Sequence, residues 1–164
     1  MPPTPRTPQA PPPHPTIDGH LAAVRRTLDR LGPREALAAV REGAVLVDTR
    51  PEFQRKASGT VPGALIIERN HLEWRCDPAS GASVPEAGHR NVRWIVFCDA
   101  GYASSLAAAS LRAIGLPRAT DLVGGFQAWR RAGLPVTPPP AGAGRPSSAQ
   151  AEHPGLDGRV ETDR

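Results

Sequence analysis

Short apolar runs alternate with helical patterns through the middle of the chain, and this alternation limits the possible folds more than any other feature. Runs this short suit strands that are buried on both faces of a sheet. The predicted strands are 44–47, 64–67, 94–97 and 119–123, and the predicted helices that follow them are 51–56, 70–75, 104–114 and 125–132. Because such alternation builds βαβ units, we expect an α/β protein with a parallel sheet and helices on both faces.

Two further helices are predicted before the first strand. Thr16 is a suitable N-cap, and apolar residues then recur at spacings of 4, 3, 4 and 3. These residues are Ile17, Leu21, Val24, Leu28 and Leu31. The spacing places them on one face of an amphipathic N-terminal helix, which packs on the domain or, alternatively, binds a partner. Pro33 suits the first position of a second helix, residues 33–42.

Proline marks the limits of the folded part. The chain has 20 prolines in 164 residues, with eight in residues 1–15 and five in residues 138–164. Proline at this density favours extended, disordered chain. The expected organisation is therefore a disordered Pro-rich tail (1–15), an N-terminal helix (16–32), a folded domain (33–137) and a second disordered tail (138–164).

Charge and cysteine content exclude several classes of protein. The net charge of +4 comes without a dense basic run, which argues against nucleic acid binding. No apolar run approaches the roughly 20 residues of a membrane span, and the N-terminus has no hydrophobic stretch for a secretory signal. Cys76 and Cys98 form no CxxC pair, so we expect no metal site. These features favour a cytoplasmic protein with free thiols.

The ends of the predicted strands bring candidate site residues together. Open parallel sheets bind ligands outside the carboxyl ends of their strands. The first strand is followed by Arg50, the second by Arg69 and the third by Cys98. We therefore expect Cys98 to lie at the site, with Arg50 and Arg69 as candidate contacts for an anion. The alternative for Arg50, which its planar fork favours, is a structural pairing with an acid such as Asp48 or Glu52.

The loop that begins at Cys98 has the features of an anion cradle. The helix that starts after it presents free N–H groups and the positive end of its dipole. Successive loop amides can converge on an anion, and Gly101 permits the turn that this requires. All three effects stabilise a thiolate at Cys98. The alternative is a buried cysteine that only fills space at the end of a strand.

Four ordered blocks resemble those of the single-domain rhodanese-like, or sulfurtransferase, family. The resemblance covers about residues 33–136. The blocks are Leu46-Val47-Asp48-Thr49-Arg50, Gly59-Thr60-Val61-Pro62-Gly63-Ala64, Cys98-x-x-Gly101 with Ser104, and Gly124-Gly125-Phe126-x-x-Trp129 followed by Gly133-Leu134-Pro135-Val136. The resemblance implies that residues 33–137 form a rhodanese-like domain with a sheet of about five strands.

The resemblance also implies chemistry through a cysteine persulfide. Cys98 would take a sulfane sulfur from thiosulfate or another persulfide and pass it to a thiol or to cyanide, and a protein persulfide is an alternative partner. No cofactor is implied. The residues implied to bind the persulfide are those of the loop, Asp99, Ala100, Gly101, Tyr102, Ala103 and Ser104.

The chain departs from the family pattern at two loop positions. Ala103 stands where arginine is common, and the residue after the cysteine is the acid Asp99. We therefore expect weaker binding of thiosulfate, and a non-catalytic binding or sensing module is the alternative function. A cysteine phosphatase would need arginine at Ser104, in the pattern Cys-x5-Arg, to clamp phosphate. Cys76 is predicted to be either a resolving thiol or a loop cysteine.

Overall fold

The computed structural model describes residues 15–142 of the chain. The predicted tails, residues 1–15 and 138–164, therefore lie almost entirely outside the described residues. No helix in the described part is both long enough and apolar enough to cross a membrane.

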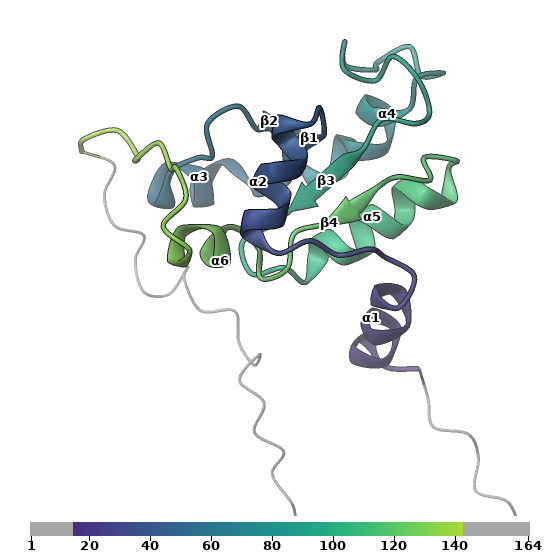
Figure 1. The fold of residues 1–164 in the computed structure, drawn as a ribbon, viewed down its shortest axis with the longest axis horizontal. Helices are drawn as coiled ribbons and strands as arrows, with labels where there is room; N and C mark the ends of the chain where they lie inside the picture. The colour runs from purple at the N-terminus through teal and green to yellow at the C-terminus, as the bar shows by residue number, and fades with distance from the viewer. Residues whose placement is uncertain (1–14, 143–164) are drawn as a thin grey trace, which may run out of the picture.

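The centre of the protein is a parallel sheet of four strands in the order β2-β1-β3-β4 (Figure 1). Every neighbouring pair is parallel, which confirms the α/β prediction. The strands are β1 (Val45–Asp48), β2 (Leu65–Ile66), β3 (Trp94–Phe97) and β4 (Thr120–Asp121). About five strands were expected. The fifth position, beside β4, is taken only by a single bridge between Leu31 and Leu122.

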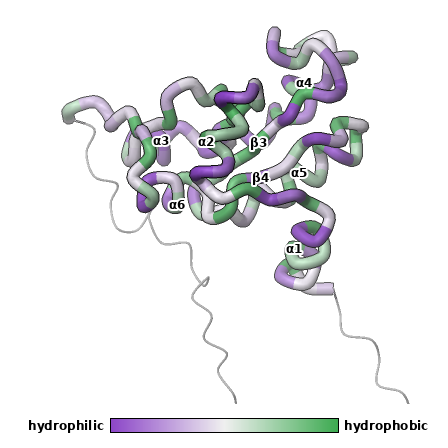
Figure 2. The backbone as a smooth tube through the Cα atoms, viewed as in Figure 1, coloured by the Kyte–Doolittle hydropathy of each residue, from purple (hydrophilic) through white to green (hydrophobic). Residues whose placement is uncertain are grey.

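Helices cover both faces of the sheet, as predicted. The helices of the described part are α1 (Ile17–Arg25), α2 (Pro33–Arg41), α3 (Glu52–Ser58), α4 (Leu72–Cys76), α5 (Ala103–Ala113) and α6 (Gly125–Arg131), with a 3₁₀ turn, η1 (Arg69–His71). Side chains of β1 and β3 alternate between two hydrophobic clusters, since successive residues of a strand face opposite sides. Val47 and Val96 pack with α4 and α5, whereas Leu46 and Ile95 pack with α2 and α6. Figure 2 shows β3 as a hydrophobic stretch in the middle of the molecule.

The prediction of one N-terminal helix over residues 16–32 is wrong beyond residue 25. The N-cap is correct, because Thr16 Oγ1 accepts a hydrogen bond from the Gly19 amide. After Arg25, however, the chain turns out of α1 and runs along the edge of β4. There the Leu31 amide donates to Asp121 O, and Leu31 O accepts from Val123. These sheet-like hydrogen bonds, which a helix could not make, override the helical periodicity.

Candidate active site

Cys98 follows β3 directly and is half-buried at the start of the loop that leads to α5. The Gly101 amide donates a hydrogen bond to Cys98 Sγ at 3.2 Å. The Cys98 thiol in turn lies 3.3 Å from Ser104 Oγ, to which it donates. Once the thiol is ionised, the Ser104 hydroxyl is placed to donate to the sulfur instead. The structure therefore places one amide donor of the loop and one hydroxyl of the first turn of α5 beside this sulfur.

The carbonyl groups of the loop are bound on its outer side. Amides of Phe126 and Gln127, in α6, donate to the carbonyls of Cys98 and Asp99 at 2.9 and 3.0 Å. All peptide bonds in the described residues are trans, and a planar trans peptide directs its N–H opposite to its C=O. The amides of Asp99 and Ala100 therefore face away from α6, and both residues line the cavity. This arrangement leaves N–H groups available to an anion.

Close packing of the loop on the start of α6 explains two glycines. Gly101 has φ of +84°, and a Cβ there would lie 2.7 Å from the Gly124 amide nitrogen. Gly125 has φ of +60°, and a Cβ there would lie 2.5 Å from the carbonyl oxygen of Cys98. Both values are too short for a real contact, so a side chain at either position would push the cysteine loop away from α6.

A cavity of about 440 Å³ opens at Cys98. Its walls come from the corner after β1, from α3 and from the cysteine loop. The lining residues are Thr49, Arg50, Pro51, Phe53, Gln54, Arg69, Cys98, Asp99, Ala100, Tyr102 and Ala103. Phe53 and Tyr102 are 53% and 39% exposed, so the cavity has aromatic side chains at its surface. Of the residues predicted from the loop, Gly101 and Ser104 lie behind the cavity wall, where both are buried.

Arg50 is held in the protein interior. Its guanidinium donates to both carboxylate oxygens of Asp48 and to the Gly59 carbonyl, and it stacks on the Phe126 ring at 3.8 Å. The remaining nitrogen, Nη1, is buried without a hydrogen-bond partner among the described residues. Because the whole side chain is 0% exposed, a ligand in the cavity does not contact the guanidinium. Arg50 thus fixes the corner after β1.

Arg69 lies at the rim of the cavity and is half-exposed. It forms an ion pair with Glu73 at 2.8 Å, one helical turn further along the chain. Burial opposes ionisation of Glu73, but hydrogen bonds from Ser110 and from the backbone, together with the Arg69 charge, lower the pKa of its carboxyl. The charge of Arg69 at this rim is therefore already paired.

The two departures from the family pattern both line the cavity. Asp99 is turned toward α6, where its Oδ2 accepts a hydrogen bond from Gln127 Nε2. Ala103 is exposed at the first position of α5. A carboxylate therefore lies beside the cavity, on the α6 side of the loop, and the loop has no cation at Ala103.

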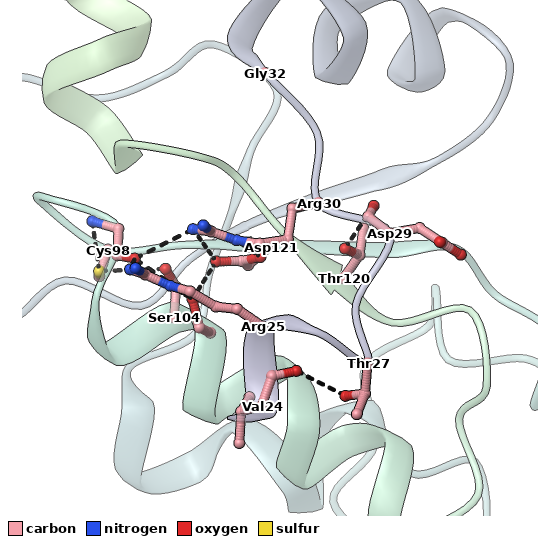
Figure 3. A network of polar contacts seen from close by, with 12 residues as sticks. Val24, Arg25, Thr27, Asp29, Arg30, Gly32, Cys98, Ser104, Thr120 and Asp121 are labelled. Atoms are coloured by element: carbon pink, nitrogen blue, oxygen red, sulfur yellow. Dashed lines mark hydrogen bonds and ion pairs between the residues drawn. The ribbon is translucent and has the colours of Figure 1, made fainter. Parts of the chain in front are cut away.

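A polar network behind the loop was not predicted from the sequence (Figure 3). Asp121 of β4 is fully buried and pairs with Arg30 through both carboxylate oxygens, at 2.9 and 3.0 Å. Its Oδ2 also accepts from the Ser105 hydroxyl at 2.6 Å. Arg25 reaches the same hydroxyl and donates to the Gly101 carbonyl at 2.7 Å. A charged residue in the apolar run of β4 was the available signal, because a buried carboxylate requires a partner.

Cys76 lies apart from this network. It is fully buried at the end of α4, in the cluster that contains Trp94 and Leu111. Burial raises the pKa of the Cys76 thiol to about 12, and the nearby Glu73 carboxylate adds to this rise. The prediction of a loop cysteine is therefore wrong in its environment, since the side chain belongs to the core.

Comparison with known proteins agrees with this geometry. The Rhodanese-like domain family model matches residues 32–132. Thiosulfate sulfurtransferase GlpE of Pseudomonas entomophila (strain L48) is 35% identical over 101 residues, which are 62% of this chain and 84% of that protein. The human single-domain sulfurtransferase TSTD1 is 26% identical, with a TM-score of 0.52, and covers 62% of this chain and 95% of its own.

A structure that also matches outside the family region comes from Rhodopseudomonas palustris CGA009. That protein is described as of unknown function and as a possible tyrosine phosphatase. It is 28% identical, with a TM-score of 0.68, and the match covers 82% of this chain and 99% of that one. The family match, the parallel sheet and a cysteine loop packed against a Gly-Gly turn agree with one another: this chain belongs to the rhodanese-like domain family.

Proposed function

We propose that the protein is a sulfurtransferase that carries a sulfane sulfur on Cys98 as a persulfide. The observation that carries this proposal is the position of Cys98 Sγ. It lies at the wall of a cavity of about 440 Å³, 3.2 Å from the Gly101 amide and 3.3 Å from the Ser104 hydroxyl. The similarity to a protein named as a thiosulfate sulfurtransferase supports the same class of reaction.

In the first step, the Cys98 thiolate attacks the sulfane sulfur of a donor. A bond forms between Cys98 Sγ and that sulfur, and the bond from that sulfur to the rest of the donor breaks. With thiosulfate, sulfite leaves with the electron pair of the broken bond. With an organic persulfide, a thiolate leaves in the same way. The product is Cys98 persulfide, whose terminal sulfur carries negative charge.

In the second step, a nucleophilic acceptor attacks the terminal sulfur of the persulfide. The sulfur–sulfur bond breaks, and Cys98 leaves as a thiolate with the electron pair. Cyanide gives thiocyanate, whereas the thiolate of an acceptor thiol gives a new persulfide on the acceptor. No side-chain base is needed in either step, because the attacking group and the leaving group are both anions.

The loop suits this chemistry because its backbone offers N–H groups to a negative charge, while its carbonyl oxygens are bound elsewhere. Amides that point at the position of developing charge stabilise that charge strongly in a site shielded from water. Here the carbonyls of Cys98 and Asp99 are bound by α6, so that the following amides are free for the persulfide. The positive end of α5, which has 11 residues, acts in the same direction.

Mass spectrometry of the intact protein tests the proposal directly. Incubation with thiosulfate or with a low-molecular-weight persulfide should add one sulfur atom, and peptide mapping should place it on Cys98. Cys98→Ser should add none and should transfer no sulfur, although its fold is nearly unchanged. Cys76→Ala is the matched control and should form the persulfide normally. A wild-type protein that gains no sulfur from any donor in a panel would support the non-catalytic binding module instead.

The geometry does not favour a phosphatase. Cysteine phosphatases with the pattern Cys-x5-Arg hold phosphate through a bidentate arginine, and Ser104 stands at that position. Arg50 cannot take that role, because its guanidinium is fully buried against Asp48. Hydrolysis of an aryl phosphate by the wild-type protein, lost in Cys98→Ser, would contradict this conclusion.

A further inference from the structure

We propose that Arg25 is a positioning residue for Cys98, and that it supplies from α1 the positive charge that Ala103 does not supply from the loop. This inference rests on the proposed function. Arg25 acts through the peptide between Gly101 and Tyr102. It holds the carbonyl of that peptide and so orients the Tyr102 amide away from Arg25, next in the chain to the Gly101 amide that donates to the sulfur.

The contact between Arg25 and the loop is direct. Arg25 Nη2 donates to the Gly101 carbonyl at 2.7 Å, and Arg30 Nη2 approaches the same oxygen at 3.4 Å (Figure 3). Because this peptide is planar and trans, its N–H, which belongs to Tyr102, points opposite to the carbonyl. The neighbouring Gly101 amide already donates to Cys98 Sγ. A guanidinium on the carbonyl also polarises the peptide and makes the Tyr102 amide a stronger donor.

The direction of the Arg25 side chain is fixed by its neighbours. The Ser105 hydroxyl gives its only proton to Asp121 at 2.6 Å, so its oxygen is left to accept from Arg25 Nε at 3.2 Å. The guanidinium also lies 5.4 Å from the centre of the Tyr102 ring, which forms part of the cavity wall. Arg25 thus contacts the loop at its backbone and at one of its side chains.

The charge balance distinguishes Arg25 from Arg30. Arg30 is neutralised by Asp121, with which it forms a two-point ion pair. Within residues 15–142, no carboxylate forms an ion pair with Arg25, so its positive charge is not cancelled locally. Among the arginines near the loop, Arg50 is paired with Asp48 and Arg69 with Glu73. Arg25 therefore contributes the net positive charge beside a site that contains the carboxylate of Asp99.

Arg25 lies outside residues 32–132, the part of the chain that the family model matches. Its place in the fold depends on the turn after α1, which carries the chain from α5 to the edge of β4. The N-terminal segment therefore contributes to the site through Arg25, and it also packs on α5.

Three substitutions test the role of Arg25. Arg25→Gln removes the charge, Arg25→Lys keeps it, and Arg26→Gln removes the exposed neighbouring charge as a matched control. Arg25→Gln should lower kcat for sulfur transfer from thiosulfate roughly tenfold, with little change in KM. This effect is smaller than the 10²–10³-fold cost of deleting a donor outright, because the Tyr102 amide is still present. Arg25→Lys should recover most of the lost kcat, and Arg26→Gln should match the wild type.

A second measurement does not depend on sulfur transfer. Iodoacetate is an anion and iodoacetamide is neutral, and both alkylate the thiolate of Cys98. The rate with iodoacetate divided by the rate with iodoacetamide therefore reports the local charge and not the fraction of thiolate. Arg25→Gln should lower this ratio at least about twofold, as expected for loss of one nearby charge, whereas Arg25→Lys and Arg26→Gln should leave it unchanged.

The outcomes separate the two proposals. If the wild type forms no persulfide but the alkylation ratio falls in Arg25→Gln, the proposed function fails and the electrostatic role of Arg25 stands. If Arg25→Gln matches Arg26→Gln in both kcat and ratio, the inference about Arg25 is overturned. Should Arg25→Gln fail to fold, Ser105→Ala takes its place in the test. The Ser105→Ala substitution removes the hydroxyl that accepts a hydrogen bond from Arg25 and orients its guanidinium. An unchanged kcat in Ser105→Ala would then overturn the inference.

Discussion

The Asp99 carboxylate accepts a hydrogen bond from the side-chain amide of Gln127 at 2.6 Å, so the acid that follows the cysteine is anchored to α6. The backbone adds a second link between the same residues, since the Gln127 amide donates to the Asp99 carbonyl. A neutral amide holds the carboxylate without cancelling its charge. Asp99 therefore contributes a fixed negative charge beside a cavity that must admit an anionic donor if thiosulfate is used.

Ala103→Arg should improve the use of thiosulfate. Ala103 lines the cavity and is exposed, so an arginine there adds a cation without displacing buried groups. We expect KM for thiosulfate to fall about three- to tenfold, with a smaller change in kcat, and the gain to shrink in 0.5 M salt because exposed charges are screened. Steady-state kinetics at two salt concentrations measure this. Ala38→Arg, on the exposed side of α2, adds the same charge elsewhere and should change nothing.

Asp99→Asn should act in the same direction. The asparagine keeps an oxygen that can accept from Gln127, so the loop should retain its shape while the negative charge is lost. We expect a two- to fivefold lower KM for thiosulfate, on the order expected for one partly screened charge. Glu42→Gln, an exposed change at the end of α2, is the control. Unchanged or higher KM in both Asp99→Asn and Ala103→Arg would mean that loop charge does not determine the choice of donor.

Cys76 should be unreactive in the folded protein. Because burial raises the pKa of its thiol to about 12, iodoacetamide at pH 8 should label Cys98 and leave Cys76 unlabelled until the protein is denatured. Cys76→Ala should keep sulfur transfer within about threefold of wild type, since a loss of this size is under about 1 kcal/mol. A collapse of activity would instead show that Cys76 takes part in the reaction.

The same pKa predicts a pH dependence of stability. The Cys76 thiol has an ordinary pKa of 9.0 and a folded pKa of about 12, so between these values the unfolded chain releases a proton that the folded protein keeps. The contribution of Cys76 to stability is therefore complete below pH 9 and is lost as pH rises toward 12. Urea unfolding at pH 8 and at pH 10.5 should show a smaller loss of stability in Cys76→Ala than in the wild type. Equal losses of stability in the two proteins would contradict the raised pKa of the Cys76 thiol.

Arg50→Met should destabilise the fold strongly while Arg69→Gln should not. Loss of Arg50 leaves the carboxylate of Asp48 buried, 1% exposed, and without its ion pair, which typically costs about 3–5 kcal/mol. Arg69 pairs with Glu73 at the surface, where the loss of a pair is typically worth at most about 1 kcal/mol. Free energies of unfolding in urea measure both. Similar values for the two variants would refute the view that Arg50 is a structural residue.

The sequence predicted the features that depend on local pattern. Short apolar runs placed the strands, and their order as βαβ units placed Cys98 at the carboxyl end of β3. The turn at residues 26–28 and the pairing of Leu31 with β4 were not predictable, because Leu28 and Leu31 continue the spacing of a helix. The link between Arg25 and Gly101 spans 76 residues in sequence and is created by that turn and pairing. The pairing of Arg50 with Asp48 agrees with the structural alternative, whereas Arg69 could not be assigned before its partner, Glu73, was known.

The bridge between Leu31 and Leu122 has a consequence for where the chain can be cut. An open strand edge offers unpaired N–H and C=O groups to any other chain, and natural proteins cover such edges. Here the main chain around Leu31 occupies that side of β4. A chain shortened to begin at residue 32, where the family match starts, would lose this cover together with Arg25 and Arg30. Such a fragment should self-associate through β4, because the segment that covers this edge lies outside the residues that the family model matches.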